Sequence, residues 1–107
     1  MIKLRKRLVF KLQFAESILS GEKKSTIRVK TNFRVNDIVD IYVGSARVGK
    51  AIIRKIVRKK ISELNDHDAR KDGFKSREDL VRELSKLYGR GIVSRDIDVY
   101  IIEFELL

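Results

Sequence analysis

The residues best suited to chemistry lie close together, between Gly21 and Arg28. Glycine adopts backbone conformations that other residues avoid, so Gly21 allows a sharp turn that brings Lys23 to the start of a strand. In a partly dry groove a lysine amine has a lowered pKa and can act as a general base. Thr26 and Arg28 project from one side of the strand, because side chains two residues apart share a face. A hydroxyl beside a fixed cation suits a phosphate, a carbonyl or a developing oxyanion.

Each of these residues also has a simpler explanation. Lys23 and Lys24 are adjacent, and most lysines in loops are solvated. Lys24 has the same strand parity as Thr26, so it competes with Lys23 for any role of a lysine. Thr26 suits a strand simply because it is β-branched. The spacing favours a ligand-facing role for Lys23 and Arg28, and it leaves the role of Thr26 open.

The elements around this segment follow from local patterns. The apolar residues of 15–19 predict one turn of helix, which Ser20 and Gly21 end. From 24 to 30 the chain alternates, which predicts a half-buried strand. Ile27 and Val29 lie on its inner side, and Thr26, Arg28 and Lys30 form a polar, basic outer face.

The rest of the chain predicts short strands with helices between them. We expect strands over 8–12, 38–43, 48–57 and 98–106, and short helical turns over 61–71. The clearest helix spans 76–88, where Ser76 and Asp79 resemble a capping box and Gly89 is a stop. Five or six short strands with inserted helices indicate a small mixed barrel of the α+β class.

Length and composition favour one domain over 1–107, assumed monomeric, since no proline and no Gly/Ser linker marks a boundary. Charges interrupt every apolar run before the roughly 20 residues of a membrane helix. The run over 8–14 contains Lys11 and Gln13 and has no cleavage site, so we expect a cytoplasmic protein without a membrane partner.

Metal and redox chemistry are not expected. The absence of cysteine excludes disulfides, thiolate catalysis and zinc sites that need sulfur. The one histidine, His67, lies between Asp66 and Asp68, and three consecutive side chains cannot all point one way. We therefore predict neither a metal nor a cofactor.

The formal charge of +10 makes nucleic acid the first partner to consider, with a Lys/Arg-rich surface for solubility or thermal stability as the alternative. One basic run could follow a phosphate backbone or simply be the exposed side of a strand. It consists of Arg54, Lys55, Arg58, Lys59 and Lys60, and it could form one patch with Arg5, Lys6 and Arg7. Phe33 and Tyr42 are the obvious stacking candidates outside the core pattern.

The segment from Phe14 to Arg28 resembles the ASCH family (activating signal cointegrator homology). Its helical residues end before Gly21, Lys23 follows two residues later, and Arg28 comes five residues after that lysine. Thr26 stands where the family commonly has threonine. The resemblance extends over roughly 8–105 and implies a PUA-like β-barrel whose groove suits RNA or a modified nucleoside.

Two functions follow from that resemblance. The first is an RNA- or nucleoside-binding protein of RNA metabolism with a basic groove. The second is an amidohydrolase that deacylates N4-acetylcytidine or a similar nucleoside, because some bacterial members use a lysine, a threonine and a glutamate. The first two correspond to Lys23 and Thr26, whereas the glutamate falls at Asp72, a shorter carboxylate that reaches less far. Asp72 before a glycine is also an ordinary turn residue, and the spacing does not select Glu63 or Glu78 instead.

Overall fold

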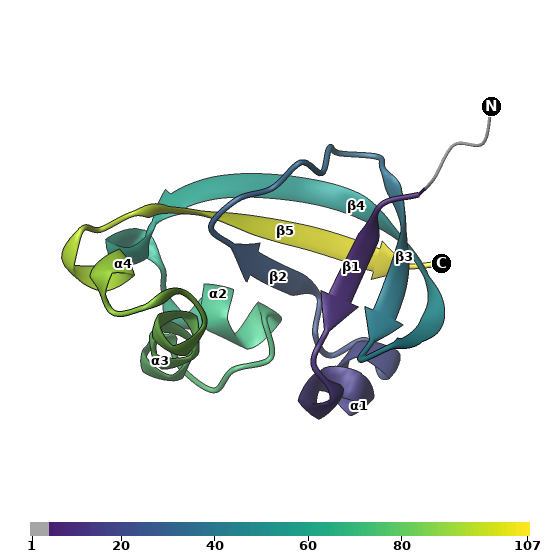
Figure 1. Ribbon diagram of the computed structural model, residues 1–107, viewed down its shortest axis with the longest axis horizontal. Helices are drawn as coiled ribbons and strands as arrows, with labels where there is room; N and C mark the ends of the chain where they lie inside the picture. The colour runs from purple at the N-terminus through teal and green to yellow at the C-terminus, as the bar shows by residue number, and fades with distance from the viewer. Residues whose placement is uncertain (1–4) are drawn as a thin grey trace.

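One five-stranded sheet, in the order β1-β3-β4-β5-β2, forms the centre of the computed structural model, which describes residues 5–107. Residues 1–4 of the basic amino-terminal segment lie outside the described residues. The strands are β1 (Arg7–Phe10), β2 (Ser25–Arg28), β3 (Ile38–Val43), β4 (Ala46–Lys60) and β5 (Asp98–Leu106). β1 pairs with β3 in parallel, and the other pairs are antiparallel. The sheet curls into a half-barrel, which brings its two edge strands, β1 and β2, near each other (Figure 1).

The helices are short except for one. They are η1 (Leu12–Phe14), α1 (Ala15–Leu19), η2 (Ile61–Glu63), α2 (Asp66–Lys71), α3 (Arg77–Tyr88) and α4 (Gly91–Ser94). α2, α3 and α4 lie together below one end of β4 and β5, and α1 lies at the foot of β1 (Figure 1). The predicted α+β class and barrel-like fold are confirmed, with five strands. Within residues 5–107 no helix has the length and apolarity that crossing a bilayer requires.

Two apolar clusters hold the sheet and helices together. One lies within the curl of the sheet and includes Leu8, Ile41 and Ile102. The other includes Leu80 and Leu84 of α3 together with Ile101 of β5. Ile101 and Ile102 are neighbours in sequence, but successive side chains of a strand point to opposite faces. Because β5 is buried on both faces, it links the two clusters.

Most local predictions agree with the structure. α1, β3 and β5 have the predicted bounds. Ser76 caps α3 by accepting a hydrogen bond from the Asp79 backbone N–H at 3.2 Å, and Gly89 ends that helix with φ 92°. The prediction missed α4, because four residues are too few to show helical periodicity.

Three strands differ from the prediction. β1 runs from Arg7 to Phe10 and ends short of the predicted residue 12, because the chain turns into η1 at Leu12. β4 runs from Ala46 to Lys60, and its register shifts between Ile53 and Lys55. A regular strand places residues three apart on opposite faces, but this bulge brings Ile53 and Ile56 to the same core cluster. In β2 the predicted polar outer face is wrong for Thr26, which is only 5% exposed, because the sheet curls over that face.

Candidate functional site

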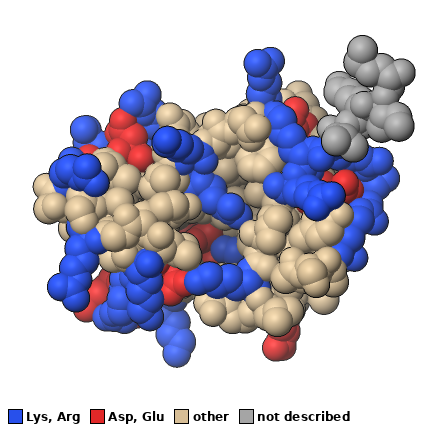
Figure 2. All heavy atoms as spheres, viewed as in Figure 1, with Lys and Arg blue, Asp and Glu red and all other residues tan. Residues whose placement is uncertain are grey.

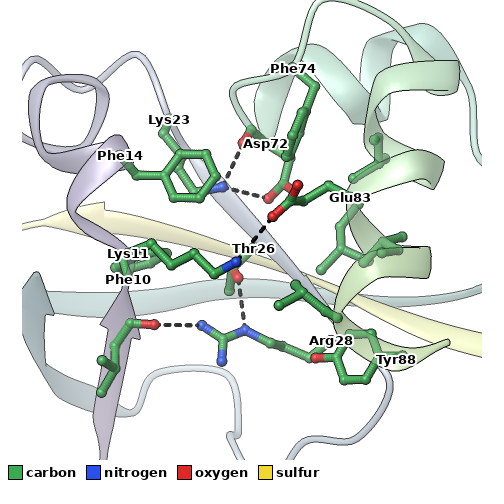
Figure 3. Close-up of a pocket in the computed structure, with 15 residues that line it drawn as sticks. Phe10, Lys11, Phe14, Lys23, Thr26, Arg28, Asp72, Phe74, Glu83 and Tyr88 are labelled. Atoms are coloured by element: carbon green, nitrogen blue, oxygen red, sulfur yellow. Dashed lines mark hydrogen bonds and ion pairs between the residues drawn. The ribbon is translucent and has the colours of Figure 1, made fainter. Parts of the chain in front are cut away.

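A cavity of about 190 Å³ lies between the two edge strands and α3 (Figure 3). Its wall contains the aromatic residues Phe10, Phe14, Phe74 and Tyr88. Its charged residues are Lys11, Lys23, Arg28, Asp72 and Glu83. Figure 2 shows a hollow near the middle of this face, where acidic and basic side chains meet. The wall combines flat apolar surfaces with a few polar groups, as small-molecule sites generally do.

Lys23 reaches the cavity because the chain reverses sharply after α1. Gly21 adopts φ 79°, a left-handed conformation that favours glycine, and the Lys23 backbone N–H then donates to the Ser17 carbonyl at 2.9 Å. The Lys23 side chain is 4% exposed. Its Nζ lies 4.7 Å from the ring centroid of Phe14 and 5.7 Å from that of Phe10. The turn therefore delivers an amine into a largely aromatic surrounding.

The partner of this amine is Asp72, the residue that ends α2. Lys23 Nζ donates to Asp72 Oδ1 at 2.8 Å and to the Asp72 backbone carbonyl at 2.5 Å. The Asp72 residue is 5% exposed, so both charges of the ion pair are buried. A buried charge is tolerated only when it is paired and hydrogen-bonded, and both conditions hold here.

Burial shifts the acid–base properties of both partners. Desolvation raises the pKa of Asp72 to about 6, although the charge of Lys23 opposes this. Desolvation also lowers the pKa of Lys23, against the attraction of Asp72. Because the pKa of Asp72 rises from 3.8 to about 6 on folding, the folded chain binds this proton more tightly. The contribution of Asp72 to stability therefore decreases as the pH rises from 3.8 to about 6.

Arg28 connects the two edge strands across the open side of the half-barrel. Its Nε donates to Thr26 Oγ1 at 2.9 Å, and its Nη2 donates to the Val9 carbonyl of β1 at 3.2 Å (Figure 3). The described strands include no backbone pairing between β1 and β2, so this guanidinium bridges them with its side chain. Since Thr26 Oγ1 accepts from Arg28, its hydroxyl hydrogen remains able to donate to a ligand.

The structure brings Lys23, Thr26, Arg28 and Asp72 to one cavity and leaves Lys24 out of it. Lys24 is exposed and lines a neighbouring hollow, which Gly21, Lys23 and Arg54 also line. The alternation of side chains along the strand did not decide between the two lysines, because Lys23 lies before β2 begins. The turn at Gly21 sets the direction of the Lys23 side chain. The functional assignment of these residues remains a prediction.

The basic run on β4 does not line this cavity. Arg54 pairs with Glu105 and Arg58 with Asp98, and Lys59 Nζ lies 2.8 Å from Asp68 Oδ2. The run also includes Lys55 and Lys60, and it follows the part of β4 that pairs with β5.

The amino-terminal cations Arg5, Lys6 and Arg7 lie at a different part of the sheet. β3 pairs with β4 only as far as Ile52, which comes before the basic run. Arg7 of β1 lies opposite Asp40 of β3, and Asp40 lies opposite Lys50 of β4. The register thus separates the two basic segments along the sheet. The two stacking candidates, Phe33 and Tyr42, do not line the cavity either. The Arg7 guanidinium carbon lies 4.7 Å from the ring centroid of Tyr42, and Lys6 Nζ lies 5.9 Å from that of Phe33.

Sequence reasoning missed the second carboxylate of the cavity, Glu83. Its Oε1 accepts from Lys11 Nζ at 3.2 Å, and the pair spans the cavity between η1 and α3 (Figure 3). The sequence feature that could have revealed Glu83 was its position on the apolar stripe of α3, between Leu80 and Leu84. The other two glutamates that the sequence offered lie elsewhere: Glu78 pairs with Arg82 on the exposed side of α3, and Glu63 Oε1 accepts from the Lys60 backbone N–H.

His67 is exposed and has no nearby set of metal ligands. Asp66 accepts from the Arg77 backbone N–H, and Asp68 pairs with Lys59. Among residues 5–107 no three His, Cys, Asp or Glu side chains gather as a metal site would require.

Comparisons with known proteins identify the fold. No family model matches the sequence, and no curated protein matches it either. Among solved structures, an ASCH domain from Lactobacillus crispatus has 14% identity and a TM-score of 0.74, covering 86% of this chain and 69% of that one. A protein from Enterococcus faecalis of the family DUF984 has 12% identity and a TM-score of 0.79, covering 100% and 78%. A mutant ASCH protein from Zymomonas mobilis has 20% identity and a TM-score of 0.58, covering 94% and 70%.

These likenesses define a class by its fold. The curled sheet with its inserted helices matches the fold of ASCH domain structures. This chain has the ASCH fold, with the cavity on the open side of the half-barrel.

Proposed function

We propose that the chain binds a nucleobase, in an RNA or a free nucleoside, within the cavity between β1, β2 and α3, and that it acts in RNA metabolism. The observation that carries this proposal is the cavity itself, with its aromatic wall and its buried polar groups. Its volume of about 190 Å³ is smaller than the roughly 300–1,000 Å³ of most ligand pockets, which favours one planar group over a large ligand.

The lining supports a base in two ways. Phe14 and Phe74 meet edge to face at 5.9 Å between centroids, and aromatic side chains are the usual stacking partners of unpaired bases. Thr26 offers a hydroxyl donor, Arg28 offers N–H donors and Glu83 offers a carboxylate acceptor. The acceptor groups and the donor groups on the edge of a base therefore both have a partner in the cavity. The charge of +10 favours ligands that carry phosphate, although this attraction is not specific.

Titration with nucleosides tests the proposal directly. We expect cytidine, uridine or adenosine, or a short single-stranded RNA, to shift the NMR signals of Thr26 and Phe74 in a saturable way. Thr26→Val keeps the side-chain shape and removes the hydroxyl, so affinity should fall about 2- to 10-fold, the value of one hydrogen bond. Lys24→Gln is the matched control, since Lys24 lies outside this cavity, and it should bind nucleosides as the wild type does. The proposal is wrong if no nucleoside and no RNA binds at low salt.

A second candidate function, hydrolysis of an acylated cytidine, is favoured by the buried Lys23–Asp72 pair. A neutral Lys23 amine could take a proton from water or from Thr26 as the oxygen attacks the acyl carbonyl. Arg28 N–H groups would stabilise the oxyanion, and a protonated Asp72 would protonate the leaving nitrogen as the C–N bond breaks. Where Thr26 is the attacking group it becomes an acetyl ester, which a water molecule then hydrolyses to release acetate. The opposed pKa shifts of the pair support both roles.

Incubation with N4-acetylcytidine tests this second function. We expect release of cytidine and acetate, and Lys23→Ala should lower the rate about 100-fold or more, the usual contribution of a general base. Lys24→Ala is the control and should retain full activity, while circular dichroism verifies that both variants fold. Absence of product, or full activity of Lys23→Ala, would rule out this assignment and leave the binding proposal standing.

A further inference from the structure

The mouth of the cavity has an uncompensated positive charge. Three cations line the cavity, and two of them have carboxylate partners. Lys23 pairs with Asp72, and Lys11 pairs with Glu83. Among residues 5–107, Arg28 takes part in no ion pair and bonds only to a hydroxyl and a carbonyl. The net charge at the mouth is therefore positive and belongs to Arg28.

Arg28 also has hydrogen-bond donors to spare. A guanidinium has five N–H groups. One is used by Thr26 Oγ1 and one by the Val9 carbonyl, so three remain. The two bonds already formed hold the planar group rigidly between β2 and β1. A rigid fork of this kind loses little entropy when it binds a phosphate through two parallel hydrogen bonds.

The neighbouring cation is held loosely. Lys11 Nζ makes one contact with Glu83, to Oε1 at 3.2 Å, and the lysine side chain is 53% exposed. Exposed ion pairs of this kind contribute little to stability, so Lys11 can exchange Glu83 for another anion at small cost. Around the same opening Val9, Leu87 and Tyr88 expose apolar surface, which suits a sugar or a neighbouring base.

We propose that the ligand of this cavity is phosphorylated: Arg28 binds the phosphate group of a nucleotide at the mouth, with Lys11 as a second cation, while the base enters the cavity. This inference rests on the proposed function and adds the ligand class. The phosphate belongs either to a free nucleotide, as a monoester, or to an RNA strand, as a diester. Both present the oxygens that the guanidinium recognises.

The experiment compares a nucleoside, its 5′-monophosphate, its 3′-monophosphate and a trinucleotide with the same central base. By calorimetry at low salt, at least one phosphorylated ligand should bind the wild type about 10-fold or more tightly than the nucleoside, because hydrogen bonds to charged groups are the strong ones. Arg28→Gln should remove that advantage, so that the nucleoside and its phosphorylated forms bind the variant with similar affinity. Arg28→Lys keeps the charge but lacks the fork, and it should lose most of the advantage. Lys24→Gln is the control and should retain it.

Because Arg28 bridges β1 and β2, its variants can be less stable, and a second measurement uses the wild type alone. The NMR signal of the Arg28 Nε–H group should shift about twofold or more further with the nucleotide than with the nucleoside. Tighter binding of the trinucleotide supports an RNA diester, and tighter binding of a monophosphate supports a free nucleotide. Equal affinities of nucleoside and nucleotides, or an Arg28 signal that moves no further with a nucleotide than with the nucleoside, would overturn the inference and leave base binding intact. If no ligand binds, the proposed function itself fails.

Discussion

Asp72→Leu is expected to lower the free energy of unfolding by about 3–5 kcal/mol at neutral pH, the usual cost of removing one partner of a buried ion pair. Leucine fills a similar volume but leaves the amine of Lys23, which is 4% exposed, without its carboxylate. The remaining neighbours of that amine include the rings of Phe10 and Phe14, which cannot replace a full negative charge. Urea denaturation of the variant and the wild type measures the difference.

The control is the double variant Lys23→Met/Asp72→Leu, which removes both charges and should recover most of the lost stability. The deficit of the single variant should also shrink as the pH rises toward 10.5, because a neutral amine needs no anionic partner. If the single and double variants are equally unstable at every pH, the loss comes from packing, and the explanation from an unpaired charge is wrong.

Ile102→Ala is expected to lower the free energy of unfolding by about 2–5 kcal/mol. Ile102 is 0% exposed, in the core cluster within the curl of the sheet, and β5 is flanked by β2 and β4. Truncation leaves a void that a sheet paired on both sides cannot close easily.

The matched control is Ile38→Ala, since Ile38 is also an isoleucine in a strand but is 46% exposed. It should cost about 1 kcal/mol or less, because surface substitutions leave packing largely unchanged. Thermal unfolding of both variants, followed by circular dichroism, gives the comparison. Similar losses at the two positions would mean that Ile102 is not the anchor that its burial implies.

Local sequence signals were sufficient for most of the elements. The helix before Gly21, the capped start of α3 at Ser76 and the strand that ends before Gly44 all depend on residues within one or two turns of each other. Propensity, capping and glycine conformation act over that range, so the chain specifies these features without reference to the rest of the fold. The bulge in β4 was not readable in this way, because it depends on pairing with β5.

The partners within the cavity could not be found locally. Asp72 is 49 residues from Lys23, and Glu83 is 72 residues from Lys11. The resemblance to a known family indicated Asp72, whereas Glu83 was a carboxylate on an apolar stripe whose meaning was visible only once α3 faced β1. The choice of Lys23 over Lys24 likewise depended on the direction in which the turn at Gly21 leaves α1.

By itself the sequence determined the class of fold, the short elements and the cluster of Lys23, Thr26 and Arg28 that begins at one glycine turn. Only the tertiary structure decided which charges are buried, which are paired and which one is left over at the mouth. The physical reason is that desolvation and pairing depend on neighbours brought together by the curl of the sheet, and no residue carries that information in its own type or its spacing.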